Sequence, residues 1–155
     1  MAAEHCLLLR KSLQQTTPSA CWPTGVTLRT FKLSDAAQAY ELLRLTNPED
    51  LLDWPAWRAQ WQRNGEYDRT LCLLVLDSAG LIALVQGWTS AYIKDLAVHP
   101  RARRQGLGRA LLAWAFDAYR QRGEATVDLR VRESNAAALR LYGQMGLQVI
   151  GRDPC

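Results

Sequence analysis

Residues 96–109 of this 155-residue chain read LAVHPRARRQGLGR, and this stretch is the strongest indication of its fold. A short apolar strand stops at His99-Pro100, because proline donates no hydrogen bond to a ladder and restricts the residue before it. A turn with Gly106 and Gly108 follows and leads into an amphipathic helix. Backbone N–H groups at a helix start attract anions, and glycines let the main chain approach a phosphate closely. The stretch therefore predicts a site for the pyrophosphate of a nucleotide.

The positive charge of the chain is concentrated in the same stretch. Four arginines lie within residues 101–109 with no acid among them, while the net charge of the whole chain is only +4. A P-loop is excluded because no GxxxxGK[ST] occurs, and a Rossmann site is not indicated because GxGxxG is incomplete. Nucleic-acid binding is disfavoured, since the basic residues crowd on a glycine loop rather than along a face with exposed aromatics. A glycine turn with a solvated basic face is the structural alternative to a nucleotide site.

Hydrophobic periodicity around this stretch predicts one mixed domain of helices and strands. Strands are expected at 26–30, 71–76, 81–89, 92–98, 126–132 and 147–150, and helices near 36–43, 54–61, 108–122 and 135–145. The strand, helix, strand passage from 92 to 132 implies a parallel crossover within an otherwise antiparallel sheet. Trp54, Trp57 and Trp61 fall on one helix face, which favours core packing over a ligand platform. The expected fold class is α+β (α/β), with a mixed, mostly antiparallel central sheet and flanking helices.

The rest of the sequence indicates the limits of the domain, the state of its cysteines and its cellular location. Polar and proline-containing residues predict an N-terminal extension over 1–24, with the domain at 25–155. Cys6, Cys21, Cys72 and Cys155 lack CxxC spacing and nearby histidines, so we expect free thiols, no metal site and no disulfide framework. No apolar run approaches the roughly 20 residues of a membrane span, and no export signature is present. We expect a cytoplasmic protein that does not insert into membranes.

Two motifs together resemble the GCN5-related N-acetyltransferase (GNAT) superfamily. Residues 103–108 fit its cofactor motif, Q/R-x-x-G-x-G/A, after Leu96-Ala97-Val98, and residues 133–147, ESNAAALRLYGQMGL, are similar to its second motif. The resemblance covers roughly residues 25–151 and implies two parallel strands that splay apart around acetyl-coenzyme A. It assigns the cofactor to Leu96, Ala97, Val98, Arg103, Arg104, Gln105, Gly106, Leu107, Gly108, Arg109 and Asn135.

The same resemblance implies a direct attack of an amine on the thioester, without a covalent enzyme intermediate. A backbone N–H freed by a bulge in the strand ending at Val98 would then stabilise the oxyanion. Tyr142, seven residues after Asn135, occupies the family's general-acid position, and the alternative is a tyrosine that only packs. The general base is open, because Tyr92 and Arg130 stand where relatives carry acids.

Asp95, acting directly or through water, is the remaining candidate for the base, with a structural role as its alternative. The leading function is N-acetylation of a primary amine of a small molecule or a protein. The competing function is a non-catalytic acyl-coenzyme A-binding module, made plausible by the missing glutamates. Lys94 and Arg130 disfavour strongly polycationic acceptors if they face the pocket.

The family's sheet normally continues with another strand after the one at 147–150. Two alternatives follow for this chain. Either the sheet edge stays open and pairs with a second chain as a homodimer, or a strand is borrowed, for example from residues 6–10.

Overall fold

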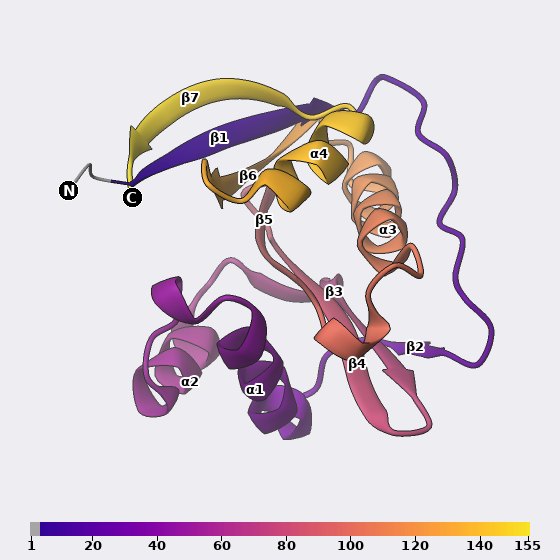
Figure 1. The fold of residues 1–155 in the computed structure, drawn as a ribbon, viewed down its shortest axis with the longest axis vertical. Helices are drawn as coiled ribbons and strands as arrows, with labels where there is room; N and C mark the ends of the chain where they lie inside the picture. The colour runs from indigo at the N-terminus through magenta and orange to yellow at the C-terminus, as the bar shows by residue number, and fades with distance from the viewer. Residues whose placement is uncertain (1–3) are drawn as a thin grey trace.

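The computed structural model describes residues 4–155, and these residues form a single seven-stranded sheet flanked by four α-helices (Figure 1). The strand order across the sheet is β2-β3-β4-β5-β6-β1-β7. The strands are β1 His5–Ser12, β2 Thr27–Arg29, β3 Tyr67–Asp77, β4 Gly80–Trp88, β5 Tyr92–Val98, β6 Thr126–Arg132 and β7 Gln148–Pro154. The α-helices are α1 Ala36–Thr46, α2 Trp54–Arg63, α3 Leu107–Gln121 and α4 Ala136–Gln144, and the 3₁₀ helices are η1 Leu33–Asp35, η2 Pro48–Asp50 and η3 Pro100–Ala102.

The sheet is antiparallel except where β5 meets β6. These two strands pair only at Tyr92 with Asp128 and at Ile93 with Leu129, and beyond that point they diverge. Antiparallel ladders join all the other neighbours. The mixed sheet with a splayed parallel pair confirms the fold class expected from the sequence.

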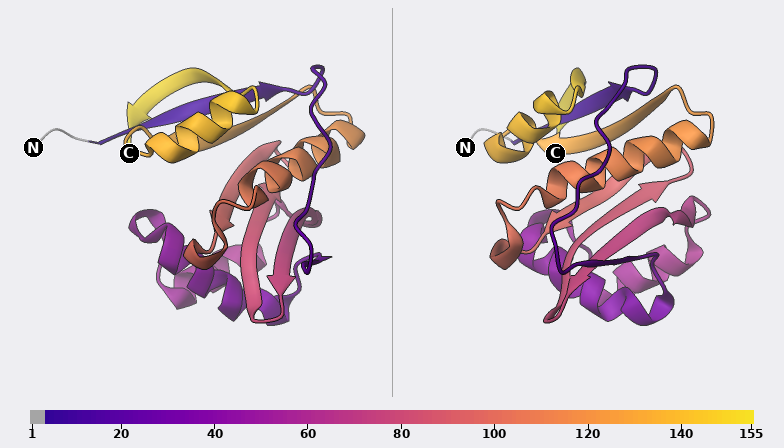
Figure 2. Two further views of the ribbon diagram at one scale, coloured as in Figure 1. Left: turned by 45° about the vertical axis from the view of Figure 1, so that its right-hand side comes forward. Right: turned by 90° about the vertical axis from the view of Figure 1, so that its right-hand side faces the viewer.

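The helices cover opposite faces of the sheet, with α3 on one face and α1 and α2 on the other (Figure 2), and a core of buried side chains lies under each set. Leu111, Leu112 and Phe116 of α3 are fully buried against the first face. On the other face, α1 packs against β4 and β5, and Trp57 of α2 is 7% exposed, with Trp54 and Trp61 packed around the same core. The tryptophan stripe is therefore a packing feature, as predicted.

A bulge in β5 changes which face its side chains meet. Gln86 pairs with Asp95 and Gly87 with Ile93, so β5 carries one residue more than β4, and that residue is Lys94. Ile93 belongs to the core under α3, whereas Ala97 belongs to the core under α1. An extra residue reverses the alternation of a strand, which is why these two odd-numbered residues face opposite ways. The bulge expected in this strand is thus present.

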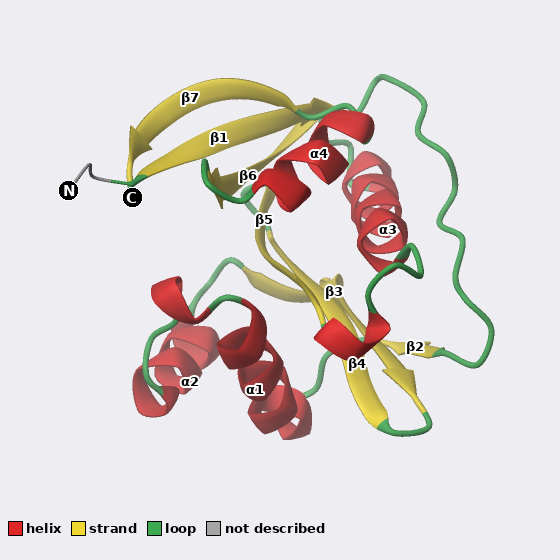
Figure 3. Ribbon diagram, viewed as in Figure 1, coloured by secondary structure: helices red, strands yellow, loops and turns green. Residues whose placement is uncertain are grey.

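The position of β1 corrects the predicted domain boundary. Residues 5–12 lie inside the sheet, paired with β6 on one side and β7 on the other, rather than in an extension before Gly25. The loop that follows runs beside α3 to β2 (Figure 3) and is held there by the Arg120 side chain, whose Nε donates to the carbonyl oxygen of Leu13 at 2.9 Å. The apolar run Cys6–Leu9 is too short to predict a strand by itself. Its partners β6 and β7 are distant in sequence, so no hairpin signal marks the pairing. Residues 5–12 thus supply the additional strand, as one of the two alternatives expected, but β7 remains the last strand of the sheet, and pairing of that edge with a second chain stays a prediction.

The predicted state of two cysteines is also corrected. Cys6 and Cys155 form a disulfide with Cα atoms 5.2 Å apart, while Cys21 and Cys72 are free. The antiparallel pairing of His5 with Pro154 brings the two cysteines together. A separation of 149 residues gives no local spacing signal, so the pair could not be read from the sequence.

Candidate functional site

The glycine turn after β5 forms a concave stretch of backbone at the start of α3. Gly106 is the residue before the helix and has φ of 78°, and Arg104 has φ of 66°, in the left-handed region that non-glycine residues rarely adopt. The first N–H groups of an α-helix have no acceptor within it, so those of Leu107, Gly108 and Arg109 are available to a ligand. A Cβ on Gly106 would meet no atom within 4 Å, which leaves the approach open. These features fit a pyrophosphate.

The arginines of this stretch have different surroundings. Arg103 and Arg104 are exposed, and neither forms an ion pair within the part of the chain that the structure describes. Arg101 is instead bound to Asp77 through a 2.6 Å contact, which holds the pKa of that carboxyl down at about 2. Arg109 turns toward α4, where its Nη2 donates to Gln144 at 2.8 Å. Two arginines, rather than four, are therefore free for an anion.

A cavity of about 850 Å³ lies between the diverging strands β5 and β6. Leu96, Asn135 and Tyr142 line it, so the structure brings these three predicted site residues together. Ala97 instead packs in the core under α1, and Val98 packs against the core under α3. The glycine turn at 103–109 does not line the cavity.

Tyr142 and Asn135 both come from α4 and its start. Tyr142 is 8% exposed, and burial raises the pKa of its hydroxyl to about 12. No hydrogen bond joins that hydroxyl to another residue within 4–155. The Asn135 side chain caps α4, because its Oδ1 accepts from the backbone N–H of Ala138 at 3.2 Å. Its amide NH₂ group is left as a donor beside the cavity.

Asp95 lies in a second, smaller cavity of about 50 Å³ between β5 and α2. Burial raises the pKa of its carboxyl, and Lys94 opposes that rise with its Nζ 4.0 Å from the Asp95 Oδ1. The two cavities share Asn47, Asp50, Trp88 and Lys94 in their walls. Asp95 and Tyr142 therefore face adjoining spaces rather than one common pocket.

The smaller cavity also contains two unusual donors. The indole N–H groups of Trp61 and Trp88 are the buried side-chain polar groups that lack a hydrogen-bond partner among residues 4–155, and both residues line this cavity. Buried donors of this kind are generally satisfied by water or by a ligand.

Several further polar residues line the larger cavity and were missed by sequence reasoning. They are Glu49, Asp50, Glu66, Ser90, Asp128, Arg132 and Ser134. They come from loops and strand ends that are far apart in sequence, so no local motif marks them. Lys94 and Arg130 also line this cavity, which is the condition under which they were expected to disfavour strongly polycationic acceptors. Arg130 donates to the backbone oxygen of Pro154 at 3.0 Å and has no carboxylate partner among the described residues.

A splayed parallel strand pair beside a glycine turn at a helix start is the architecture of the GNAT fold. Residues 36–147 match the model of the acetyltransferase (GNAT) family, and the chain belongs to that family.

Relatives in this family carry acetyltransferase names. The chain is 52% identical to the ribosomal protein bS18-alanine N-acetyltransferase of Escherichia coli K12 over 56 residues, which is 36% of this chain and 38% of the relative. It is 35% identical to the mycothiol acetyltransferase of Salinispora tropica over 153 residues, covering 89% of this chain and 50% of that protein. A GCN5-related N-acetyltransferase from Sphaerobacter thermophilus superposes with a TM-score of 0.84 and 28% identity, over 98% of this chain and 50% of that one. The chain thus spans about half the length, or less, of these relatives.

Neither a membrane helix nor a metal cluster is found in the described residues. No helix within 4–155 has both the length and the apolar character to cross a bilayer. The same residues contain no group of three or more histidine, cysteine or acidic side chains placed to hold a metal ion.

Proposed function

We propose that this chain transfers an acetyl group from acetyl-coenzyme A to a primary amine of a small molecule or a protein. The observation that carries the proposal is the 850 Å³ cavity at the splay of β5 and β6, with Tyr142 and Asn135 in its wall. Relatives named for ribosomal protein bS18 alanine and for mycothiol support an amine or small-molecule acceptor without selecting one. We retain a cytoplasmic location as part of the proposal.

The cofactor would lie with its pyrophosphate on the turn at 103–109. The left-handed residues Arg104 and Gly106 and the helix start supply N–H donors there, and Arg103 adds charge. The pantetheine arm would pass Leu96 and the free amide of Asn135 toward the cavity. The thioester of acetyl-coenzyme A supplies the activated acetyl group, and the chain's residues align the acceptor with it.

Two groups would handle the protons. Tyr142 stays protonated at neutral pH because burial raises its pKa to about 12, so its hydroxyl can donate to the departing thiolate. Asp95 would take a proton from the acceptor amine, directly or through a water in the adjoining cavity. Its raised pKa makes it a better base than an exposed aspartate once it is ionised. A backbone N–H of β5 near the bulge would stabilise the oxyanion.

Glu66 is the alternative base that the structure introduces. It lines the larger cavity together with Tyr142, and it forms no ion pair with another described residue. The two carboxyls are distinguished by the pH dependence of kcat/KM. Asp95→Asn should remove the acidic limb of the profile, and Glu66→Gln should leave that limb in place. The reverse pattern would assign the base to Glu66.

Release of coenzyme A with a panel of amines tests the proposal as a whole. Incubation of the chain with acetyl-coenzyme A and primary amines should release thiol above the rate of uncatalysed hydrolysis. Binding of acetyl-coenzyme A without any transfer would favour the non-catalytic module instead.

A further inference from the structure

The Cys6–Cys155 disulfide lies in the wall of the larger cavity. Both cysteines line that cavity, which Asn135 and Tyr142 also line. Cys6 is 7% exposed, whereas Cys155, the residue after β7, is exposed. A thiol that approaches this wall would therefore reach the Cys155 side of the bridge first.

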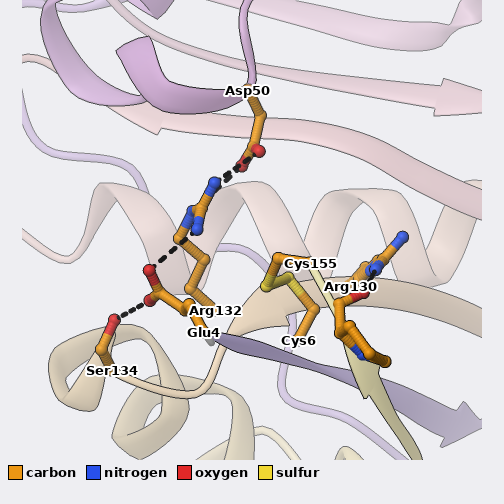
Figure 4. Close-up of polar contacts among 8 residues, drawn as sticks. Glu4, Cys6, Asp50, Arg130, Arg132, Ser134 and Cys155 are labelled. Atoms are coloured by element: carbon orange, nitrogen blue, oxygen red, sulfur yellow. Dashed lines mark hydrogen bonds and ion pairs between the residues drawn. A yellow bond between two sulfur atoms is a disulfide. The ribbon is translucent and has the colours of Figure 1, made fainter. Parts of the chain in front are cut away.

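A series of hydrogen bonds leads from Cys155 through Glu4 to Arg132 and Asp50, and Figure 4 shows its side-chain part from Glu4 onward. The backbone N–H of Cys155 donates to the Glu4 carbonyl at 3.0 Å, and the Glu4 carboxylate accepts from Arg132 Nη1 at 2.9 Å. Arg132 Nη2 then donates to Asp50 of η2 at 2.7 Å. Because Arg132 belongs to β6 and Asp50 to the segment between α1 and α2, this chain of contacts joins the two sides of the cavity.

A second hydrogen bond of Glu4 leads toward Asn135, the residue predicted to contact the cofactor. The Ser134 hydroxyl donates to the other oxygen of the Glu4 carboxylate, and Ser134 immediately precedes Asn135. The side-chain hydrogen bond from Ser134 is the largest cause of the lowered pKa of Glu4, and Arg132 adds to it. Glu4 thus connects the disulfide to both Asn135 and the cavity mouth.

The exposed ion pairs of Glu4 and Asp50 with Arg132 are too weak to hold this network together by themselves. The Glu4 and Asp50 side chains are 40% and 51% exposed, and exposed pairs contribute little because they must order two side chains in solvent. The covalent bond adds to the backbone pairs that join Cys6 to Arg132 and His5 to Pro154, and it helps to keep Glu4 beside Arg132. Without the bond, only these terminal pairs of the two ladders hold that end of β1, and the ends of ladders open most easily.

We propose that the Cys6–Cys155 disulfide is a thiol-sensitive latch that couples the redox state of the chain to occupancy of the substrate cavity. A thiolate of a dithiol attacks Cys155 Sγ, the disulfide bond breaks, and Cys6 leaves as a thiolate. The second thiolate of the reagent then displaces Cys155, which yields two protein thiols and one oxidised dithiol. The open form binds coenzyme A ligands more weakly, because Asn135 and η2 lose their common anchor. In a reducing compartment, such as the one proposed above, disulfides are rare, and those that occur are usually transient or redox-sensing.

The proposal rests on the proposed function only in taking this cavity as the coenzyme A site. The test uses desulfo-coenzyme A, which lacks the thiol and cannot exchange with the bridge. Its Kd is measured by calorimetry for the oxidised chain and for the chain reduced by dithiothreitol. The fraction of disulfide is measured separately in buffers of reduced and oxidised dithiothreitol, with and without the ligand, by alkylation and mass spectrometry.

We expect the Kd to rise about 5-fold or more on reduction, the lower end of typical coupling between sites. By linkage, saturating ligand must shift the reduction equilibrium by the same factor toward the disulfide. Cys155→Ser should show the Kd of the reduced chain, and Cys21→Ser, which removes an exposed free thiol, should behave as the wild type. Equal Kd values for the two redox forms would overturn the latch and leave the proposed function standing. Absence of binding to either form would contradict both.

Discussion

Replacement of Tyr142 by phenylalanine tests whether Tyr142 acts as a proton donor or only packs in the core. The ring remains, so the contacts that keep Tyr142 at 8% exposure persist. The lost hydroxyl has no hydrogen-bond partner among residues 4–155, so no described group is left unpaired. The free energy of unfolding and the affinity for acetyl-coenzyme A should therefore change little.

The expected loss in rate follows from the pKa of this phenol. General acids typically contribute about 10² to 10⁴ in rate. Burial raises the pKa of Tyr142 to about 12, well above the value of about 8.5 for an ordinary thiol, so full proton transfer to the thiolate is uphill. Hydrogen-bond donation then dominates, and the loss should lie near the lower end, about 10², or about 2.7 kcal/mol in activation free energy.

Steady-state kinetics with acetyl-coenzyme A and an active amine measure this loss. We expect kcat and kcat/KM to fall together, because the interaction is made in the transition state. A thermal melt with and without acetyl-coenzyme A serves as the control for folding and binding. Wild-type turnover by the phenylalanine variant, with chemistry shown to be rate-limiting, would refute the acid role and leave Tyr142 as a packing residue.

Three further predictions concern the cofactor turn, the buried carboxyl and the sheet. Acetyl-coenzyme A at about 100 times its Kd should stabilise the fold by about 2.7 kcal/mol in a thermal melt. Arg103→Ala should reduce that gain without changing the ligand-free melt, whereas Arg101→Ala, whose guanidinium is already paired, should retain it. Burial raises the pKa of Asp95 in the folded state, so its contribution to stability is lost as pH rises through that pKa. Asp95→Asn should therefore raise the unfolding free energy at neutral pH while lowering activity, and a denaturant titration that shows no gain would contradict this. Gly87→Ala should cost about 1–3 kcal/mol in the same titration, because the added Cβ would collide with the Tyr119 hydroxyl, and an unchanged midpoint would show that the site can relax.

The elements with strong local signals could be predicted from the sequence. The strand 92–98 and the strand 126–132 have the predicted bounds, because alternation and flanking turn residues mark both ends. The glycine turn and α3 were recognisable because helix starts and left-handed glycines have a local signature. The hairpin turn between β3 and β4 was marked in the same way by Asp77 and Gly80.

The features that depend on distant pairing could not be predicted. β1 is stabilised by β6 and β7, more than 100 residues away, and its own sequence shows only a short apolar run. The disulfide follows from the same pairing. The separation of Asp95 from the cavity of Tyr142 depends on the bulge at Lys94, whose position decides the face on which Asp95 lies. Sequence motifs therefore located the glycine turn before α3, whereas the residues that line the two cavities could be identified only from the three-dimensional arrangement.

The most direct test of the account is mass spectrometry of a reaction containing the chain, acetyl-coenzyme A and a panel of primary amines. We predict an amine product heavier by one acetyl group, formed in equal amount to free coenzyme A and strongly reduced with Tyr142→Phe. Stable binding of acetyl-coenzyme A with no acetylated amine across the panel, or transfer that is indifferent to Tyr142, would contradict it.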